Sequence, residues 1–315
     1  MLRDPREDGV TSPSRRLGAA LLGVAALAVV VTACGGASTA PKGGAIAVVA
    51  AENFWGSIVG QLGGSHVTVT SVVTDPNADP HDYQSNPSTA RAFATARYVV
   101  VNGAGYDSWA ANLLDANHSS DRTVFTVADL LGRKEGDNPH FWYSPDYVGK
   151  VAGRITSDLS TIDPGDAAYF TQQRAAFETA LQPYHDRIAA IRQRFSGRTV
   201  ASTESIFQYM AVALGLNVIS PPEFMKAVSE GNDPPAGTIT TFQQQLQTKA
   251  ASILVYNRQT ATDVTTNLQR LAAQQGIPVV GLSETVQPPD ATFQQWMVSE
   301  LNDLQNALNA SGSTQ

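Results

Sequence analysis

The chain has 315 residues, of which 43% are hydrophobic and 16% charged, and its formal net charge is −7 at pH 7. An acidic protein of this kind offers no electrostatic footprint for nucleic acid. Its single cysteine, Cys34, excludes an internal disulfide, so the packing of an apolar core must stabilise the fold.

The first 33 residues have the composition of a secretory signal. Four arginines provide a basic start, and an apolar run over 17–31 follows. This run is shorter than the roughly 20 residues that a transmembrane helix needs, although a transmembrane anchor is the alternative. Small residues precede Cys34, as in bacterial lipoprotein signals, in which such a cysteine is lipidated and becomes the mature N-terminus. The sequence therefore predicts a signal peptide over 1–33 and an extracytoplasmic protein that a lipid on Cys34 anchors to the bacterial cell membrane.

After a flexible tether over 34–44, short apolar runs alternate with helical segments. In the N-terminal half we predict, in chain order, strand 46–50, helix 54–62, strand 67–73, helix 87–96, strand 98–101 and a weaker strand 124–127. Strands that alternate with helices imply a parallel sheet covered by helices on both faces.

A long helix is predicted between the two halves. Asp163 suits the position before a first helical turn, Pro164 suits that turn, and no glycine follows Gly165 until Gly197. Apolar and aromatic side chains recur there with helical spacing: Phe170, Phe177, Leu181, Tyr184, Ile188, Ile191 and Phe195. We expect a helix over 163–196 that joins the halves as a stiff spine, with a kink at Pro183.

The alternating pattern starts again after this helix. We predict strand 199–202, helix 205–214, strand 218–219, helix 238–247, strand 252–256, helix 263–275, strand 278–282 and helix 292–309. The predicted fold class is therefore α/β, with two lobes over 45–162 and 197–315. Each lobe has a parallel sheet flanked by helices, and the single long helix joins them.

Two of the five histidines and two acids occur in unusual contexts. His81 lies in an Asp-Pro-His loop, and His140 lies between a proline and two aromatic residues. Glu204 and Glu284 come shortly after predicted strands. Ligands collect beyond the carboxyl ends of strands in open parallel sheets. Two imidazoles and two carboxylates suit a borderline divalent cation, so these four residues are candidate metal ligands.

Each candidate also has an ordinary structural explanation. His81 could be a polar loop residue, and His140 could be a buried histidine packed on an aromatic ring. Glu204 opens a predicted helix, where the macrodipole favours an acid, and Glu284 could be a surface acid. The other three histidines are expected to be surface or helix residues: His66, His118 and His185.

These motifs resemble those of a known family. The run over 79–109, with Asp-Pro-His and the strand that leads to Asn102 and Gly103, is similar to the metal-binding cluster of ABC-transporter substrate-binding proteins that take up manganese, zinc or iron. Asn-Pro-His before an aromatic residue resembles the family's second motif, and the Asp-Pro helix resembles its interdomain helix. The similarity runs over about 45–309. It implies four metal ligands: His81, His140, Glu204 and Glu284. The family's fourth ligand is usually Asp, which makes Asp290 the nearest rival of Glu284.

The sequence therefore predicts a monomeric lipoprotein that captures Mn²⁺, Zn²⁺ or Fe²⁺ as its transported ligand and delivers it to an ABC permease. Two carboxylates shift the preference toward the harder Mn²⁺ or Fe²⁺ without excluding Zn²⁺. The alternatives are an adhesion or interaction lipoprotein with a structural metal, and an exported metallohydrolase. Four protein ligands leave no open catalytic position, and the chain has no His-Glu-x-x-His or Gly-x-Ser-x-Gly motif, so we expect no enzyme.

Overall fold

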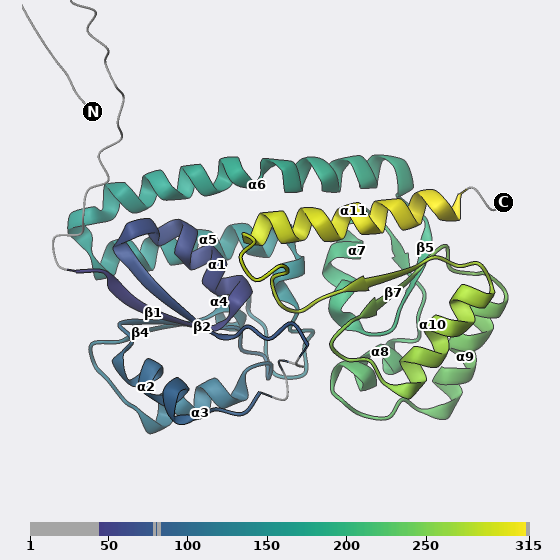
Figure 1. The fold of residues 1–315 in the computed structure, drawn as a ribbon, viewed down its shortest axis with the longest axis horizontal. Helices are drawn as coiled ribbons and strands as arrows, with labels where there is room; N and C mark the ends of the chain where they lie inside the picture. Colours follow the sequence, from purple (N-terminus) through teal and green to yellow (C-terminus); the bar gives the residue numbers. More distant parts are fainter. Residues whose placement is uncertain (1–43, 78–79, 81–82, 313–315) are drawn as a thin grey trace, which may run out of the picture. The chain divides into compact units, whose positions relative to one another are not determined.

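In the computed structural model, which describes residues 44–77, 80 and 83–312, eight strands form two parallel four-stranded sheets (Figure 1). The N-terminal sheet has the order β2-β1-β3-β4 and the C-terminal sheet the order β6-β5-β7-β8. The strands are β1 Ile46–Glu52, β2 Val67–Val73, β3 Tyr98–Val101, β4 Thr123–Thr126, β5 Thr199–Ser202, β6 Asn217–Val218, β7 Leu254–Asn257 and β8 Val279–Leu282. In both sheets the strand order reverses beside the first strand, where open parallel sheets bind ligands.

The two central strands of the N-terminal sheet, β1 and β3, are buried on both faces, whereas the edge strands β2 and β4 are partly exposed. Along β1, Val48 and Ala50 pack into the main apolar cluster, whereas Val49 and Ala51 pack into a smaller one on the other face. Successive side chains of a strand point to opposite faces, so a run without polar residues is what a doubly covered sheet requires. Strand β1 extends two residues beyond the predicted 46–50 and ends at Glu52.

Helices cover both faces of this first sheet. Their bounds are α1 Asn53–Gly63, η1 Gly64–His66, α2 Pro87–Thr95, α3 Ser108–Ala116, α4 Val127–Leu131, η3 Phe141–Tyr143 and α5 Pro145–Ile162. The sequence prediction missed α3, α4 and α5. The start of α5 carried a readable signal, because Ser144 caps it by accepting a hydrogen bond from the Tyr147 N–H, and Pro145 occupies its first turn.

The C-terminal half repeats this layering with η5 Ser205–Phe207, α7 Gln208–Leu214, α8 Pro222–Ser229, α9 Ala236–Gln247, α10 Asp263–Gln274 and α11 Phe293–Ser311. The predicted helix 205–214 begins as the short 3₁₀ turn η5, and α8 was missed. Thr262 and Thr292 open α10 and α11 with capping boxes.

The predicted linking helix is present. A 3₁₀ turn, η4 Pro164–Asp166, leads into α6 Ala167–Phe195, a helix of 29 residues that continues through Pro183. All seven residues of its apolar stripe are buried. Helix α6 packs against α1 and α5 in the N-terminal half and against α7 and α11 in the C-terminal half (Figure 1). The α/β architecture with two sheets and one long helix is thus confirmed, whereas the kink at Pro183 stays a prediction.

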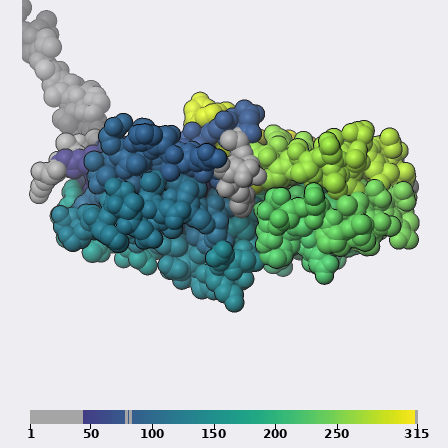
Figure 2. Space-filling model, turned by 90° about the horizontal axis from the view of Figure 1, so that it is seen from below, coloured from purple at the N-terminus to yellow at the C-terminus, as the bar shows by residue number. Residues whose placement is uncertain are grey.

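The largest apolar cluster is continuous between the two halves. It includes Phe54 and Trp142 from the first half, Phe207 and Trp296 from the second, and the buried face of α6. On the face seen in Figure 2, the blue-to-teal N-terminal half meets the green C-terminal half along one boundary. Within the described ranges, no helix has both the length and the apolarity to cross a membrane.

Candidate metal centre

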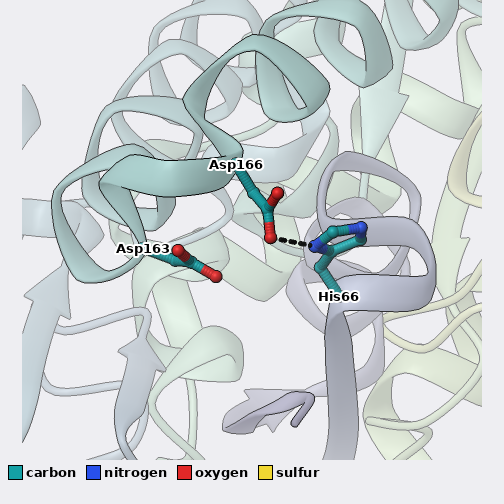
Figure 3. A group of neighbouring side chains, drawn as sticks. All are labelled: His66, Asp163 and Asp166. Atoms are coloured by element: carbon teal, nitrogen blue, oxygen red, sulfur yellow. Dashed lines mark ion pairs between the residues drawn. The ribbon is translucent and has the colours of Figure 1, made fainter. Parts of the chain in front are cut away.

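The described residues contain two groups of side chains whose ligand atoms lie close enough together to hold a metal ion. The first is His66, Asp163 and Asp166 at the start of α6 (Figure 3). Here His66, expected to be a surface or helix residue, ends the 3₁₀ helix η1 and is fully buried, and its Nδ1 forms an ion pair of 2.8 Å with Asp166 Oδ2. This pair attaches η1 to the beginning of α6, which gives the group a structural role.

The second group brings together three of the four predicted ligands. The ligand atoms of His140, Glu204 and Glu284 lie within 4.8 Å of one another, and all three residues are 0% exposed. His140 Nε2 is 3.9 Å from Glu284 Oε2. The rival acid, Asp290, is exposed and does not belong to the group. His81 and Cys34 lie outside the described residues.

Both acids stand at the carboxyl edge of the C-terminal sheet. Glu204 lies two residues beyond β5, and Glu284 lies two residues beyond β8. Between these strands β7 ends at Asn257, which is 2% exposed. Its Nδ2 donates to Glu204 Oε1 at 2.9 Å and also to Glu284 Oε1. The amide thus bridges two carboxylates that would otherwise repel each other.

The loop before η3 fixes the orientation of the His140 ring. Asn138 Nδ2 donates to the Ser205 carbonyl at 2.8 Å, which leaves Asn138 Oδ1 facing His140. The backbone N–H of His140 donates to this oxygen at 3.1 Å, and the His140 Nδ1 lies 2.8 Å from it. Because Oδ1 can only accept, Nδ1 carries the proton, and Nε2 is the ring nitrogen that faces Glu284. Metal-binding imidazoles usually donate their other ring N–H to an oxygen acceptor, a part that Asn138 Oδ1 plays here.

The loop after β3 supports the site from the N-terminal half. Asn102 Nδ2 donates to the Pro139 carbonyl at 2.9 Å and so holds the loop that carries His140. The Asp107 carboxylate accepts from the backbone N–H groups of Asn102 and Gly103 at 2.6 and 2.8 Å. Gly103 has a φ of 77°, and a Cβ there would lie 2.7 Å from a Thr126 methyl carbon, so this turn requires glycine.

Two further acids are buried near the site. Burial, reinforced by the neighbouring Asp107, raises the pKa of Glu52 well above its usual value. Behind Glu284, burial raises the pKa of Glu300 to about 7, although hydrogen bonds partly oppose the shift. Glu300 accepts from the backbone N–H of Ser283 at 2.8 Å and from the Tyr143 hydroxyl at 2.5 Å. This network fixes the residue directly before Glu284.

The site borders a cavity of about 460 Å³ that residues of both halves line. Tyr106 lines it and donates its hydroxyl to Glu284 Oε2 at 2.6 Å. Ser205 lines it as well, with Oγ 3.3 Å from His140 Nδ1. The other lining residues include three acids and one lysine: Glu135, Asp137, Glu230 and Lys226. The cavity therefore reaches the immediate neighbours of the buried group and has an excess of negative charge.

Sequence reasoning missed Asn257, Tyr106 and Glu300 as parts of the site, and it noted Asn138 only as part of the Asn-Pro-His motif, without a role. Asn257 could have been found, because it directly follows the predicted strand 252–256 and so shares the sheet edge with the two acids. Glu300 also carried a signal, because it lies four residues after Trp296 and four before Leu304, on the apolar stripe of α11, where an acid is unusual.

Comparison with known proteins places this arrangement in a family. The chain is 27% identical over 204 residues to the manganese-binding lipoprotein MntA of Halalkalibacterium halodurans, an alignment that covers 61% of this chain and 66% of the relative. It is 25% identical to the iron-binding protein YfeA of Yersinia pestis, over 49% of this chain and 52% of the relative. The chain thus spans between half and two thirds of the length of these two relatives.

The fold is also that of solved structures. The periplasmic zinc binding protein TroA from Treponema pallidum superposes with a TM-score of 0.69 at 16% identity, over 85% of this chain and 99% of that protein. The family described as "ZnuA: Zinc-uptake complex component A periplasmic" matches residues 48–307. Because the match takes in most of both halves and the long helix, the chain belongs to the ZnuA family.

Proposed function

We propose that this protein is an extracytoplasmic solute-binding lipoprotein that captures one divalent transition metal ion and delivers it to an ABC permease for uptake. The observation that supports this most strongly is the convergence of His140, Glu204 and Glu284, fully buried, with ligand atoms within 4.8 Å. We propose these three residues as metal ligands, with His81 as a further ligand on the sequence motif alone. Relatives named for manganese, iron and zinc binding support Mn²⁺, Fe²⁺ or Zn²⁺ as the cargo.

The chemistry of the group suits a dication. The two carboxylates balance a charge of +2, and the His140 Nε2 lone pair adds the nitrogen donor that borderline cations prefer. A buried site removes water from the cation, so the protein donors must replace the hydration shell. The network behind each ligand holds these donors in place before binding, which reduces the cost of ordering them.

We further propose that the organisation predicted from the sequence applies: a signal peptide over 1–33, lipidation at Cys34, a tether over 34–44, lobes over 45–162 and 197–315, and a linking helix over 163–196. The continuous apolar cluster between the halves and α6 supports a receptor whose halves move little when the ion binds. A binding and transport role also agrees with a family described as part of an uptake complex.

The binding proposal is tested by titrating metal-stripped protein without residues 1–33 with Mn²⁺ and Zn²⁺ in a calorimeter. We expect one ion per chain at submicromolar affinity in the wild type. His140→Ala should abolish this binding, whereas His118→Ala, at an exposed histidine, should not change it. Substoichiometric or millimolar binding by the wild type would contradict the proposal.

The delivery step is tested in a deletion strain of the host. Growth that fails in metal-poor medium and recovers with excess Mn²⁺ or Zn²⁺ would support transport. Normal metal uptake together with lost adhesion would instead support the interaction role.

A further inference from the structure

Asn257 forms hydrogen bonds with one oxygen of each of the two acids in the site. One Nδ2 donates to both acids, to Glu204 Oε1 at 2.9 Å and to Glu284 Oε1. Its Oδ1 accepts the backbone N–H of Gln259 at 2.9 Å, which establishes that the NH₂ side of the amide, rather than the oxygen, faces the acids. Since an amide NH₂ has two protons, each carboxylate receives one.

This bridge divides the two oxygens of each acid into different roles. In Glu284, Oε1 is held by Asn257, whereas Oε2 is the oxygen near His140 Nε2. Tyr106 also donates to Oε2, and an oxygen with two lone pairs can accept this hydrogen bond and still bind a cation. In Glu204, Oε1 is held by Asn257, and Oε2 is the oxygen that the amide does not engage. If either acid bound a cation with both oxygens, that cation would lie close to the amide proton that Oε1 accepts from Asn257, so the bridge disfavours two-oxygen binding.

We propose that Asn257 is a specificity-determining residue that holds Glu204 and Glu284 in one-oxygen binding and so favours Zn²⁺ over Mn²⁺. The inference rests on the proposed function. With the bridge in place, His140 and the two acids supply three donor atoms; without it, two-oxygen binding by both acids would supply five. Zn²⁺ is satisfied by four ligands in a tetrahedron, whereas Mn²⁺ prefers about six in an octahedron. The bridge thus opposes the preference for harder cations that the residue types alone predict.

The test is a competition titration that measures the Kd of Zn²⁺ and Mn²⁺ for the wild type, Asn257→Leu and Tyr106→Phe. Leucine has the same branched arrangement of four side-chain heavy atoms as asparagine but donates no hydrogen bond. We expect Asn257→Leu to reduce the ratio of the Mn²⁺ Kd to the Zn²⁺ Kd at least about tenfold, the lower range of effects from groups that support metal ligands. Tyr106→Phe is the matched control. It removes a donor to Glu284 but leaves the bridge intact, so it should change both affinities in parallel.

An unchanged ratio in an Asn257→Leu variant that binds one Zn²⁺ per chain would overturn the inference. If that variant does not fold, crystal structures of the wild type loaded with Zn²⁺ and with Mn²⁺ decide the question. Binding of either cation by both oxygens of Glu204 or Glu284 would overturn it, and one oxygen from each would support it. A wild type that binds neither cation refutes the proposed function itself, a result distinct from a failure of the role of Asn257.

Discussion

Glu284→Gln separates the contribution of this residue to metal binding from its contribution to folding. Two carboxylate charges with oxygens within 4.8 Å repel each other by about 3 kcal/mol at an effective dielectric constant of about 20. Glutamine has nearly the same shape, and its amide oxygen can still accept from Asn257. The metal-free variant should therefore unfold with a free energy equal to that of the wild type or greater by at most about 3 kcal/mol.

Metal should stabilise the wild type but should hardly stabilise the variant. At a free ion concentration of about 100 times Kd, binding stabilises the wild type by about 2.7 kcal/mol, and Glu284→Gln should lose most of this gain. Urea unfolding with and without Zn²⁺ measures both quantities, and Asp290→Asn, at an exposed acid, is the control that should match the wild type. The reasoning is wrong if the metal-free variant is less stable than the wild type by more than about 1 kcal/mol, the typical effect of a harmful substitution, or if Zn²⁺ still stabilises it fully.

Three further predictions concern two side chains beside the proposed ligands and one in helix α6. Asn138→Ala should weaken Zn²⁺ binding about 10- to 100-fold in calorimetry, because it frees the His140 ring; an unchanged affinity would show that the ring needs no such support. The raised pKa of Glu300, about 7 against 4.5, means that its contribution to stability is present at low pH and lost as the pH rises through about 7. Relative to Glu300→Gln, the wild type should therefore lose about 3 kcal/mol of unfolding free energy between about pH 4.5 and 8, and a constant difference would contradict the burial argument. Leu181→Ala, on the buried stripe of α6, should cost about 2–5 kcal/mol in urea unfolding, and a smaller loss would indicate that α6 does not depend on this stripe.

The sequence predicted the fold where the pattern was strong. The stripe from Phe170 to Phe195 repeats with helical spacing over many turns, and apolar runs such as β1 and β3 leave little choice but a buried strand. Two of the missed helices, α3 and α4, carry weak patterns, whereas α5 has a clear apolar stripe that the prediction overlooked: Val148, Val151, Ala152, Ile155 and Leu159. The apolar stripe of α3 is short, because the helix has nine residues; Ala110 is buried, and Trp109, Leu113 and Leu114 are partly buried beside it. Similarly, α4 has five residues, too few for a periodicity to appear.

For the site, strand ends identified Glu204 and Glu284, because residues just beyond parallel strands share one edge of a sheet. The sequence could not show that Asn257 bridges both acids, since this depends on β7 lying between β5 and β8. Nor could it show that His66 is buried, because its partner Asp166 is 100 positions away along the chain. Contacts of this kind depend on packing between elements rather than on local pattern.

The most direct test of the central claim is an anomalous-difference map from a crystal of the protein stripped of metal and reloaded with one equivalent of Zn²⁺. We predict a single peak at about 2.0–2.2 Å from His140 Nε2 and from one oxygen each of Glu204 and Glu284. A peak at His66, Asp163 and Asp166 instead, or no ordered peak at all, would contradict the account.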